Sequence, residues 1–159
     1  MSGNQLIAGY TTGNVDLYDT RESSPVIASF EGTSKIIKAQ FLTNRRHELI
    51  TGASDGSVYI WDVRQKGHVL KLCEPLPENE ICSFAIHAQA PLIAYASNTQ
   101  NVKIMNLNGE TLGLIKYHEG FLNRSIGPIF GMEFHPRQLR ITINTGISLS
   151  MYNSSINAK

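Results

Sequence analysis

The sequence of 159 residues has only two cysteines, and no run of like charge is longer than the pair Arg45 and Arg46. Two thiols, Cys73 and Cys82, do not make the disulfide framework of a small secreted domain, and no Cys-x-x-Cys pair accompanies them. The 14 Lys and Arg residues nearly balance the 13 Asp and Glu residues, so nothing indicates a surface for nucleic-acid phosphates. We therefore expect a protein of the reducing cytoplasm that has no nucleic acid as a partner.

Long apolar segments are also missing. No stretch approaches the roughly 18 to 20 apolar residues of a membrane span, and the N-terminus lacks the basic and apolar segments of a secretory leader. Outside the secretory pathway, the glycosylation sequons at Asn123 and Asn153 have no role. With 42% hydrophobic residues, the chain has the composition of one soluble globular domain, or of part of one.

A repeat of about 43 residues organises the chain. The segment LIAGYTTGNVDLYDTR from Leu6 aligns without gaps with LITGASDGSVYIWDVR from Leu49 and with LIAYASNTQNVKIMNL from Leu92. A weaker copy, LRITINTGISLSMYNS, begins at Leu139, and the insertion HEGFLNRSIGPI precedes it. Each copy has β-branched and aromatic runs broken by Gly, Asn, Asp and Pro, without a helix-length amphipathic pattern. Four strands in each repeat of this length predict a β-propeller blade.

The copy that begins at Leu49 has the clearest strands. It predicts strands over residues 49–54, 57–62, 68–72 and 81–87. Asp55 and Gly56 predict a tight turn, because Gly56 can adopt positive φ and the Asp55 carboxylate can accept hydrogen bonds from turn amides. Gly13 and Gly146 hold corresponding places, which identifies them as turn glycines rather than parts of a phosphate-binding loop.

The dipeptide Trp61-Asp62, at the end of its predicted strand, is the one that defines WD repeats. Its counterparts in the other copies are Tyr18-Asp19, Met105-Asn106 and Tyr152-Asn153. Each pair joins a large side chain, which can pack between blades, to an Asp or Asn that can bond local backbone. The chain thus resembles the WD-repeat propellers. Because Glu31-Gly32 and His118-Glu119 replace the family's Gly-His, its buried Asp, His, Ser and Trp network cannot be completed here.

Counting strands predicts an all-β WD-repeat β-propeller section of about three and a half four-stranded blades. The predicted repeat units cover approximately residues 5–35, 36–80, 81–128 and 129–155. The chain opens on the second strand of one blade and closes on the third strand of another. WD-repeat propellers have about seven blades, on the order of 300 residues. We expect the remainder of the same protein to supply the rest, with a ring-completing homodimer as the alternative, and the end blades to have apolar, uncovered faces.

Two segments in the second half of the chain are more specific than the blade pattern. LNGETLGLIKYHEGFLNRSIGPIFGMEFHP, from Leu107, is similar to a stretch of the Raptor family in which Ile-Lys-Tyr leads into a Gly-Phe-containing loop and a Phe-His-Pro strand end. FAIHAQAPLIAYAS, from Phe84, is similar to the family's Ile-His-Pro-Gln-Ala turn, with Ala88 where proline is common. The resemblance implies the C-terminal propeller of a non-enzymatic scaffold whose partners are subunits of the TOR kinase complex. The alternative is a generic WD-repeat adaptor of another assembly, such as a ubiquitin-ligase or chromatin complex.

The sequence has no residue pattern typical of catalysis or cofactor binding. The five histidines have no Gly-x-Ser-x-Gly elbow near them, and no Gly-x-x-x-x-Gly-Lys loop occurs. His87 and His135 occupy equivalent strand ends, which predicts a repeated structural turn rather than a pair of metal ligands. Arg21 and Arg64 also recur, either as a basic contact site or as solvated strand ends. We expect no enzyme, no cofactor and no metal site.

The segment Glu119–Pro128, EGFLNRSIGP, breaks the repeat without an evident structural need. Recognition by rigid scaffolds commonly lies in such loops, and aromatic residues and arginine are favoured at interfaces. The candidate partner-binding residues are Phe121, Leu122, Asn123 and Arg124. In the alternative reading, Phe121 and Leu122 pack onto the propeller surface and hold a long loop in place.

Overall fold

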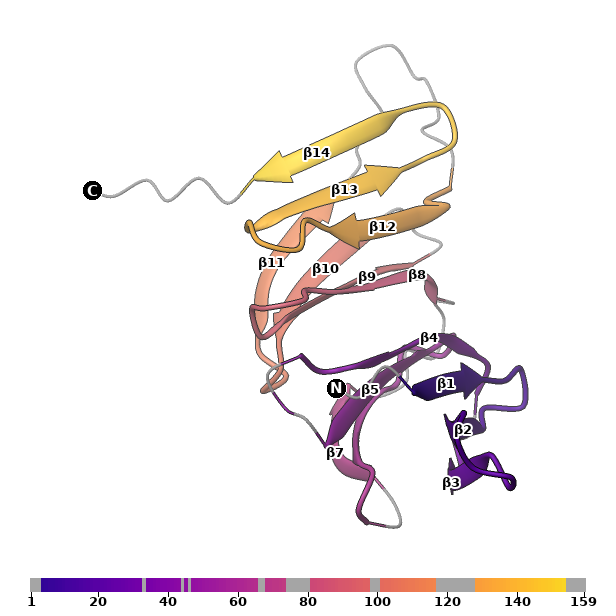
Figure 1. Cartoon of the computed structure of the whole chain (residues 1–159). Helices are drawn as coiled ribbons and strands as arrows, with labels where there is room; N and C mark the ends of the chain where they lie inside the picture. Colours follow the sequence, from indigo (N-terminus) through magenta and orange to yellow (C-terminus); the bar gives the residue numbers. More distant parts are fainter. Residues whose placement is uncertain are drawn as a thin grey trace, which may run out of the picture. The chain divides into compact units, whose positions relative to one another are not determined.

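The computed structural model describes residues 4–32, 34–43, 45, 47–65, 68–73, 81–97, 101–116 and 128–153. Strands are the regular elements in these ranges, as Figure 1 shows, and the all-β prediction is confirmed. The strands are β1 (Gln5–Gly9), β2 (Val15–Asp19), β3 (Val26–Phe30), β4 (Ile36–Phe41), β5 (Glu48–Ala53), β6 (Val58–Asp62), β7 (His68–Cys73), β8 (Ile81–Ile86), β9 (Leu92–Ser97), β10 (Asn101–Asn106), β11 (Thr111–Lys116), β12 (Gly131–Phe134), β13 (Arg140–Asn144) and β14 (Leu149–Asn153).

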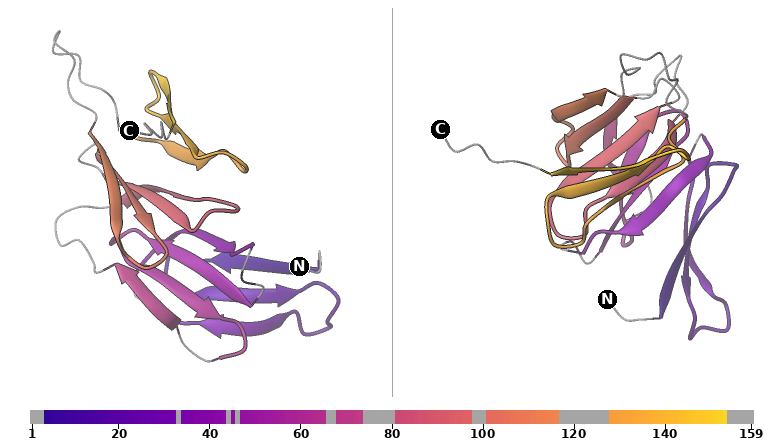
Figure 2. Two further views of the ribbon diagram at one scale, coloured as in Figure 1. Left: turned by 90° about the vertical axis from the view of Figure 1, so that its left-hand side faces the viewer. Right: turned by 90° about the horizontal axis from the view of Figure 1, so that it is seen from above.

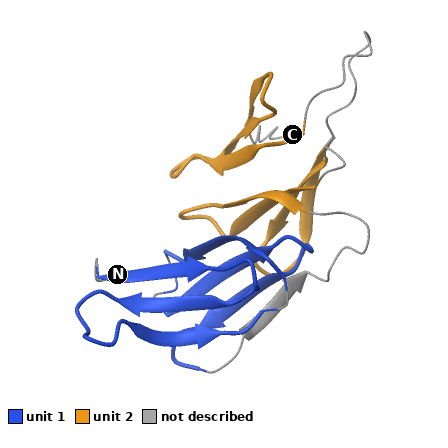
Figure 3. Ribbon diagram, turned by 90° about the vertical axis from the view of Figure 1, so that its right-hand side faces the viewer, with its two compact units in different colours: residues 1–80 blue, residues 81–159 orange. Residues whose placement is uncertain are grey.

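The strands fall into two compact units, residues 1–80 and residues 81–159, which Figure 3 distinguishes by colour. The N-terminal unit contains a three-stranded sheet, β1-β2-β3, and a four-stranded sheet, β4-β5-β6-β7. The C-terminal unit contains a four-stranded sheet, β11-β10-β9-β8, and a three-stranded sheet, β12-β13-β14, whose strands run side by side in Figures 1 and 2. Hydrogen-bonded neighbours are antiparallel. The predicted section of a WD-repeat propeller is therefore confirmed, with two complete blades and an incomplete blade toward each end of the chain.

Glycines in the left-handed region form the tight turns that join neighbouring strands. Gly13, Gly56 and Gly146 have φ values of 96°, 89° and 81°, a region that residues with a Cβ rarely adopt. The backbone N–H of Ser57 donates to Asp55 Oδ1 at 2.9 Å, as predicted for this turn. These turns fix the strand pairing, and so decide which side chains share a sheet face.

In the N-terminal unit the two sheets pack around Trp61. The buried residues of this cluster are Val15, Leu17, Phe30, Leu49 and Trp61. The Trp61 side chain is 2% exposed, and its Nε1–H donates to Thr51 Oγ1 at 2.9 Å. The Phe30 ring of β3 lies 5.2 Å from it between ring centroids. Trp61 therefore packs between neighbouring blades, as the repeat predicts.

In the C-terminal unit β8 contacts β12, and apolar side chains of both sheets meet in one core. The buried residues of this core are Ala85, Ala94, Ala96, Val102, Ile129, Met132, Phe134, Ile141 and Ile143. Ile81, Phe84 and Ile86 of β8 are also buried, which confirms the prediction of a strand packed on both faces.

Strand pairing corrects the alignment of the later repeats. In every copy the residue at the Trp61 position pairs with an apolar residue of the preceding strand. The pairs are Leu6 with Tyr18, Leu49 with Trp61, Ile93 with Met105 and Ile141 with Tyr152. The counterparts of Leu49 are therefore Ile93 and Ile141, whereas the sequence alignment placed Leu92 and Leu139 there. The third copy was wrong by one residue, because Leu92 and Ile93 are both apolar although they face opposite sides of the strand. The weaker fourth copy was wrong by two residues.

Candidate functional site

The candidate loop residues Phe121, Leu122, Asn123 and Arg124 lie outside the described residues. In sequence they stand between β11 and β12, each of which is an end strand of its sheet. The assignment of these residues to partner binding therefore stays a prediction.

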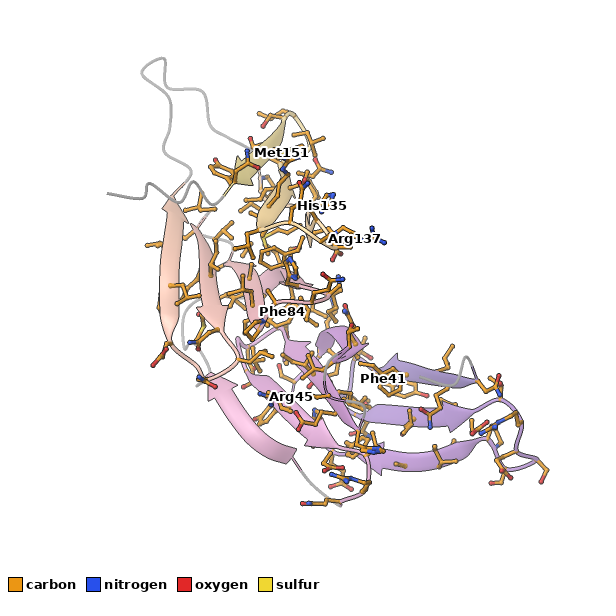
Figure 4. The ribbon with its side chains drawn as sticks, turned by 60° about the vertical axis from the view of Figure 1, so that its left-hand side comes forward. Phe41, Arg45, Phe84, His135, Arg137 and Met151 are labelled. Atoms are coloured by element: carbon orange, nitrogen blue, oxygen red, sulfur yellow. The ribbon has the colours of Figure 1, made fainter. Side chains whose placement is uncertain are left out.

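His87 and His135 cap equivalent turns after inner strands. The Nδ1 atom of His87 accepts hydrogen bonds from the backbone N–H groups of Gln89 and Ala90 at 3.0 and 2.8 Å. His135 Nδ1 accepts hydrogen bonds from the backbone N–H groups of Arg137 and Gln138 at 3.2 and 3.1 Å, and Figure 4 labels His135 and Arg137. Each imidazole thus satisfies two turn amides, as the repeat predicts.

The His87 ring also joins two turns of the C-terminal unit. With Nδ1 accepting from amides, the neutral ring carries its proton on Nε2, which lies 3.1 Å from the carbonyl oxygen of Gln138. The ring centroid is 5.5 Å from that of Phe134. His87 is 5% exposed, so these contacts make it a buried structural link between blades.

Arg21 and Arg64 each form an ion pair with the Asp two residues before. Nε and Nη2 of Arg64 donate to the two carboxylate oxygens of Asp62 at 2.9 and 2.5 Å. The same two atoms of Arg21 donate to the carboxylate oxygens of Asp19 at 2.9 and 2.6 Å. The Asp side chains are 8% exposed, whereas those of Arg21 and Arg64 are 59% and 63% exposed. These pairs stabilise strand ends, a role that leaves one edge of each guanidinium facing solvent.

The two pairs predict acid sensitivity. Hydrogen bonds from the arginines lower the pKa of Asp19 and of Asp62 from 3.8 to about 2. The carboxyl groups of Asp19 and Asp62 bind protons more weakly in the folded protein than in the unfolded chain. The stabilisation of the fold by the two ion pairs is therefore complete above about pH 4 and disappears as the pH falls to about 2. Thermal unfolding followed between pH 5 and pH 2 is expected to depend less on pH in Asp62→Asn than in the wild type.

The matched control for this measurement is Glu22→Gln, which removes an exposed carboxylate from the same hairpin as Asp19. It is expected to keep the wild-type pH dependence. An Asp62→Asn protein with an unchanged pH dependence would show that the pair contributes nothing to stability.

One face of the β12–β14 sheet has two exposed apolar side chains on β14. Leu149 and Met151 of β14 are 72% and 56% exposed, and Met151 is labelled in Figure 4. Tyr152 holds the Trp61 position in β14, so Leu149 and Met151 correspond to Val15 and Leu17 of β2. Val15 and Leu17 are 0% and 1% exposed because the next sheet covers them. The same positions are thus buried in one blade and exposed in the other, which indicates a face built to pack on a further sheet.

The β1–β3 sheet also has an uncovered face. It corresponds to the face of the β4–β7 sheet that packs against β1–β3. Leu6 and Tyr18 lie there at the positions of Leu49 and Trp61. The Tyr18 hydroxyl lies 2.7 Å from the Tyr10 hydroxyl and donates to Asp16 Oδ2 at 3.3 Å. The hydrogen bond with Tyr18, and to a lesser extent burial and Asp16, raise the pKa of Tyr10.

A cavity of about 420 Å³ lies in the C-terminal unit beside β14. Its lining is mostly apolar and comprises Leu92, Ile104, Leu112, Gly113, Ile115, Phe134, Leu139, Ile141, Tyr152 and Asn153. Tyr152 and Asn153 of β14 form part of the lining, and among the described strands none pairs with the free edge of β14. Sequence reasoning missed the cavity, because its walls come from strands far apart in the chain.

Within the described ranges, no cluster of three or more His, Cys, Asp or Glu side chains is arranged to hold a metal ion. Nor does any helix in the described part of the chain have the length and apolar character needed to cross a membrane.

Comparison with known proteins found relatives along nearly the whole chain, although no family model matches it. The chain is 33% identical over 159 residues to "Protein raptor homolog" of Dictyostelium discoideum, covering 96% of this chain and 10% of that protein. It is 28% identical over 155 residues to "Regulatory-associated protein of TOR 1" of Arabidopsis thaliana, covering 94% of this chain and 12% of that protein. The chain thus spans about a tenth of the length of these relatives.

The solved structures include a similar fold. The crystal structure of Chaetomium thermophilum Raptor superposes with a TM-score of 0.85 at 19% identity, over 97% of this chain and 15% of that chain. The strand arrangement described above is therefore also present within a much longer polypeptide.

Proposed function

The chain resembles a segment of the Raptor proteins, and from this premise we propose that it is a section of a non-catalytic WD-repeat scaffold in a TOR kinase complex. The observation that carries the proposal is the similarity to "Protein raptor homolog", which extends over 96% of the chain. The resemblance of the second half of the sequence to the Raptor family supports the same assignment. The activities of the relatives belong to proteins about ten times longer, so TOR kinase subunits are proposed partners.

The physical role of such a section is to present surfaces on a rigid frame. Antiparallel sheets packed face to face hold their loops in fixed positions, which suits binding of several proteins. We assign the frame to four repeat units, at residues 5–35, 36–80, 81–128 and 129–155. The proposed scaffold is cytoplasmic, has no catalytic residues and takes no cofactor or nucleic acid.

A generic WD-repeat adaptor of a ubiquitin-ligase or chromatin complex was the alternative from sequence. Blade pattern alone supports it, and blade pattern is common to many unrelated proteins. The similarity to Raptor relatives along both halves of the chain favours the TOR complex.

Purification of the native protein from its own cells tests the proposed function. By native protein we mean the polypeptide as those cells contain it, including any segments attached to the 159 residues. A tag on it is expected to recover the TOR kinase in stoichiometric amount. Recovery of a ubiquitin-ligase or chromatin complex without the kinase would favour the adaptor.

The loop prediction is tested in the same purification. The double variant Phe121→Ala and Arg124→Ala is expected to weaken recovery of at least one partner about tenfold or more, since interface aromatic residues and arginines contribute most to binding. Arg137→Ala is the matched control, because it removes an arginine from the turn after β12. Undiminished recovery of every partner by the double variant would leave Phe121 and Leu122 as residues that hold the loop.

A further inference from the structure

The two units differ in how side chains fill the space between their sheets. In the N-terminal unit the rings of Phe30 and Trp61 occupy the space between the β1–β3 and β4–β7 sheets, with their centroids 5.2 Å apart. In the C-terminal unit the cavity of about 420 Å³ lies between the β8–β11 and β12–β14 sheets, whose strands Figure 1 labels. We call it the seam cavity.

Smaller side chains in the C-terminal unit account for the seam cavity. The β2–β3 and β10–β11 pairs have a register shift at the same place, so their residues can be matched one to one. The replacements from the N-terminal to the C-terminal unit are Ala28 by Gly113, Phe30 by Ile115 and Trp61 by Tyr152. Each replacement removes volume from the same space. A Cβ atom added to Gly113 would meet no atom within 4 Å, which agrees with open space beside that residue.

A strand paired with the outer edge of β14 does not by itself fill the seam cavity. In the N-terminal unit β7 pairs with the corresponding edge of β6, but the two rings that fill the space belong to β3 and β6. Their counterparts in the C-terminal unit are β11 and β14, which carry the smaller side chains. We therefore expect the seam cavity to stay open when β14 has a neighbouring strand.

The lining of the seam cavity fits an uncharged aromatic ring. Its walls include the rings of Phe134 and Tyr152, against which a further ring can pack at an offset or edge to face. None of the described residues that line it is charged, so a charged group buried there would have no counter-charge. The cavity volume lies within the range of about 300–1,000 Å³ that is usual for ligand sites.

The seam cavity is accessible from solvent past apolar side chains. Leu112 and Leu139 line it and are 57% and 46% exposed. Exposed apolar residues around a pocket are typical of surfaces that bind proteins, and aromatic side chains are common anchors in such pockets. The occupant that suits both the cavity and its surroundings is an aromatic side chain on another protein.

We propose that the seam cavity receives a tryptophan or phenylalanine side chain of a protein partner. The bound ring takes the space that Phe30 and Trp61 fill in the N-terminal unit. The inference rests on the proposed scaffold function and deepens it by naming the chemistry of one partner. Recovery of the TOR kinase tests the scaffold function, whereas a loss of binding confined to variants of the seam cavity tests the pocket.

Filling the seam cavity with the protein's own side chains separates binding from folding. The triple variant Gly113→Ala, Ile115→Phe and Tyr152→Trp gives it the residues of the N-terminal unit. In the native protein this variant is expected to keep or raise the free energy of unfolding, and to lower recovery of one protein partner about tenfold or more. Leu114→Ala is the matched control, because Leu114 is 50% exposed on the opposite face of β11.

Recovery of every partner at the wild-type level by the folded triple variant would overturn the proposal and leave the scaffold function intact. If the triple variant is less stable than the wild type, Gly113→Val provides the same test, because it places one side chain into open space. Gly113→Val is then expected to weaken recovery of the same partner, and undiminished recovery would have the same meaning.

Photo-crosslinking in the native protein identifies the occupant. With p-benzoylphenylalanine in place of Leu139, the cross-linked peptide is expected to belong to another protein and to contain a tryptophan or phenylalanine. Replacement of that aromatic residue by alanine is expected to reduce the cross-link about tenfold. A peptide from the same polypeptide or from a second copy would contradict the proposal. So would a partner peptide without an aromatic residue, or the absence of any cross-linked protein.

Discussion

Replacement of Trp61 with alanine is expected to lower the free energy of unfolding by about 3–5 kcal/mol. The side chain is 2% exposed and fills the space between the β1–β3 and β4–β7 sheets, against Phe30 and Tyr59. Truncation leaves a cavity that the surrounding strands cannot fill, because their hydrogen-bonded pairing fixes their positions. Denaturant unfolding of the native protein, with and without the substitution, measures this loss.

Two matched variants separate packing from hydrogen bonding at this position. Trp61→Phe keeps an aromatic ring but removes the N–H that donates to Thr51, so a smaller loss than that of alanine is expected. Thr51→Val keeps the shape of Thr51 and leaves the indole N–H without its acceptor, which is expected to cost about 1–3 kcal/mol. A loss below about 1 kcal/mol for Trp61→Ala would contradict the packing role.

The double variant Leu149→Asp and Met151→Asp is expected to destabilise the native protein by about 4 kcal/mol or more. Both residues are exposed in this chain, but their counterparts in β2 are buried under a neighbouring sheet. If a further blade covers them in the native protein, the substitutions bury two carboxylates without cations. Thermal unfolding of the native protein measures the effect.

The same substitutions have little effect if the face is a true surface, since surface changes are within about 0.5 kcal/mol. Ile147→Asp is the matched control, because Ile147 is 74% exposed in the turn between β13 and β14 rather than on the sheet face. Equal and small effects of the control and of the double variant would mean that no blade packs there.

Much of the fold was predictable because the repeat encodes it at positions where one residue type has one physical role. Gly56 needs positive φ, and Trp61 needs a large space between sheets. Sequence could not distinguish Leu92 from Ile93 as the counterpart of Leu49, since both are apolar. Only the pairing of Ile93 with Met105 shows which of them faces which side.

The candidate sites were predictable to a lesser degree. Equivalent places in two repeats identified His87 and His135 as turn residues, and their Nδ1 hydrogen bonds confirm it. The Arg64 interpretation stayed open because an arginine two residues after Asp62 can turn either to solvent or back onto the carboxylate. The hydrogen bond from Ser29 to Asp16 joins β3 to β2, and pairing across strands is not visible in a single sequence.

Oxidative footprinting of Met151 in the native protein tests most directly the central claim that this chain is a section of a larger propeller. Met151 is 56% exposed in the chain described here, and Met132, at 7% exposed, provides a buried reference in the same unit. The account predicts that Met151 is oxidised in the native protein as slowly as Met132, because a further blade covers the β12–β14 face. Oxidation of Met151 at the rate of a freely exposed methionine would contradict it.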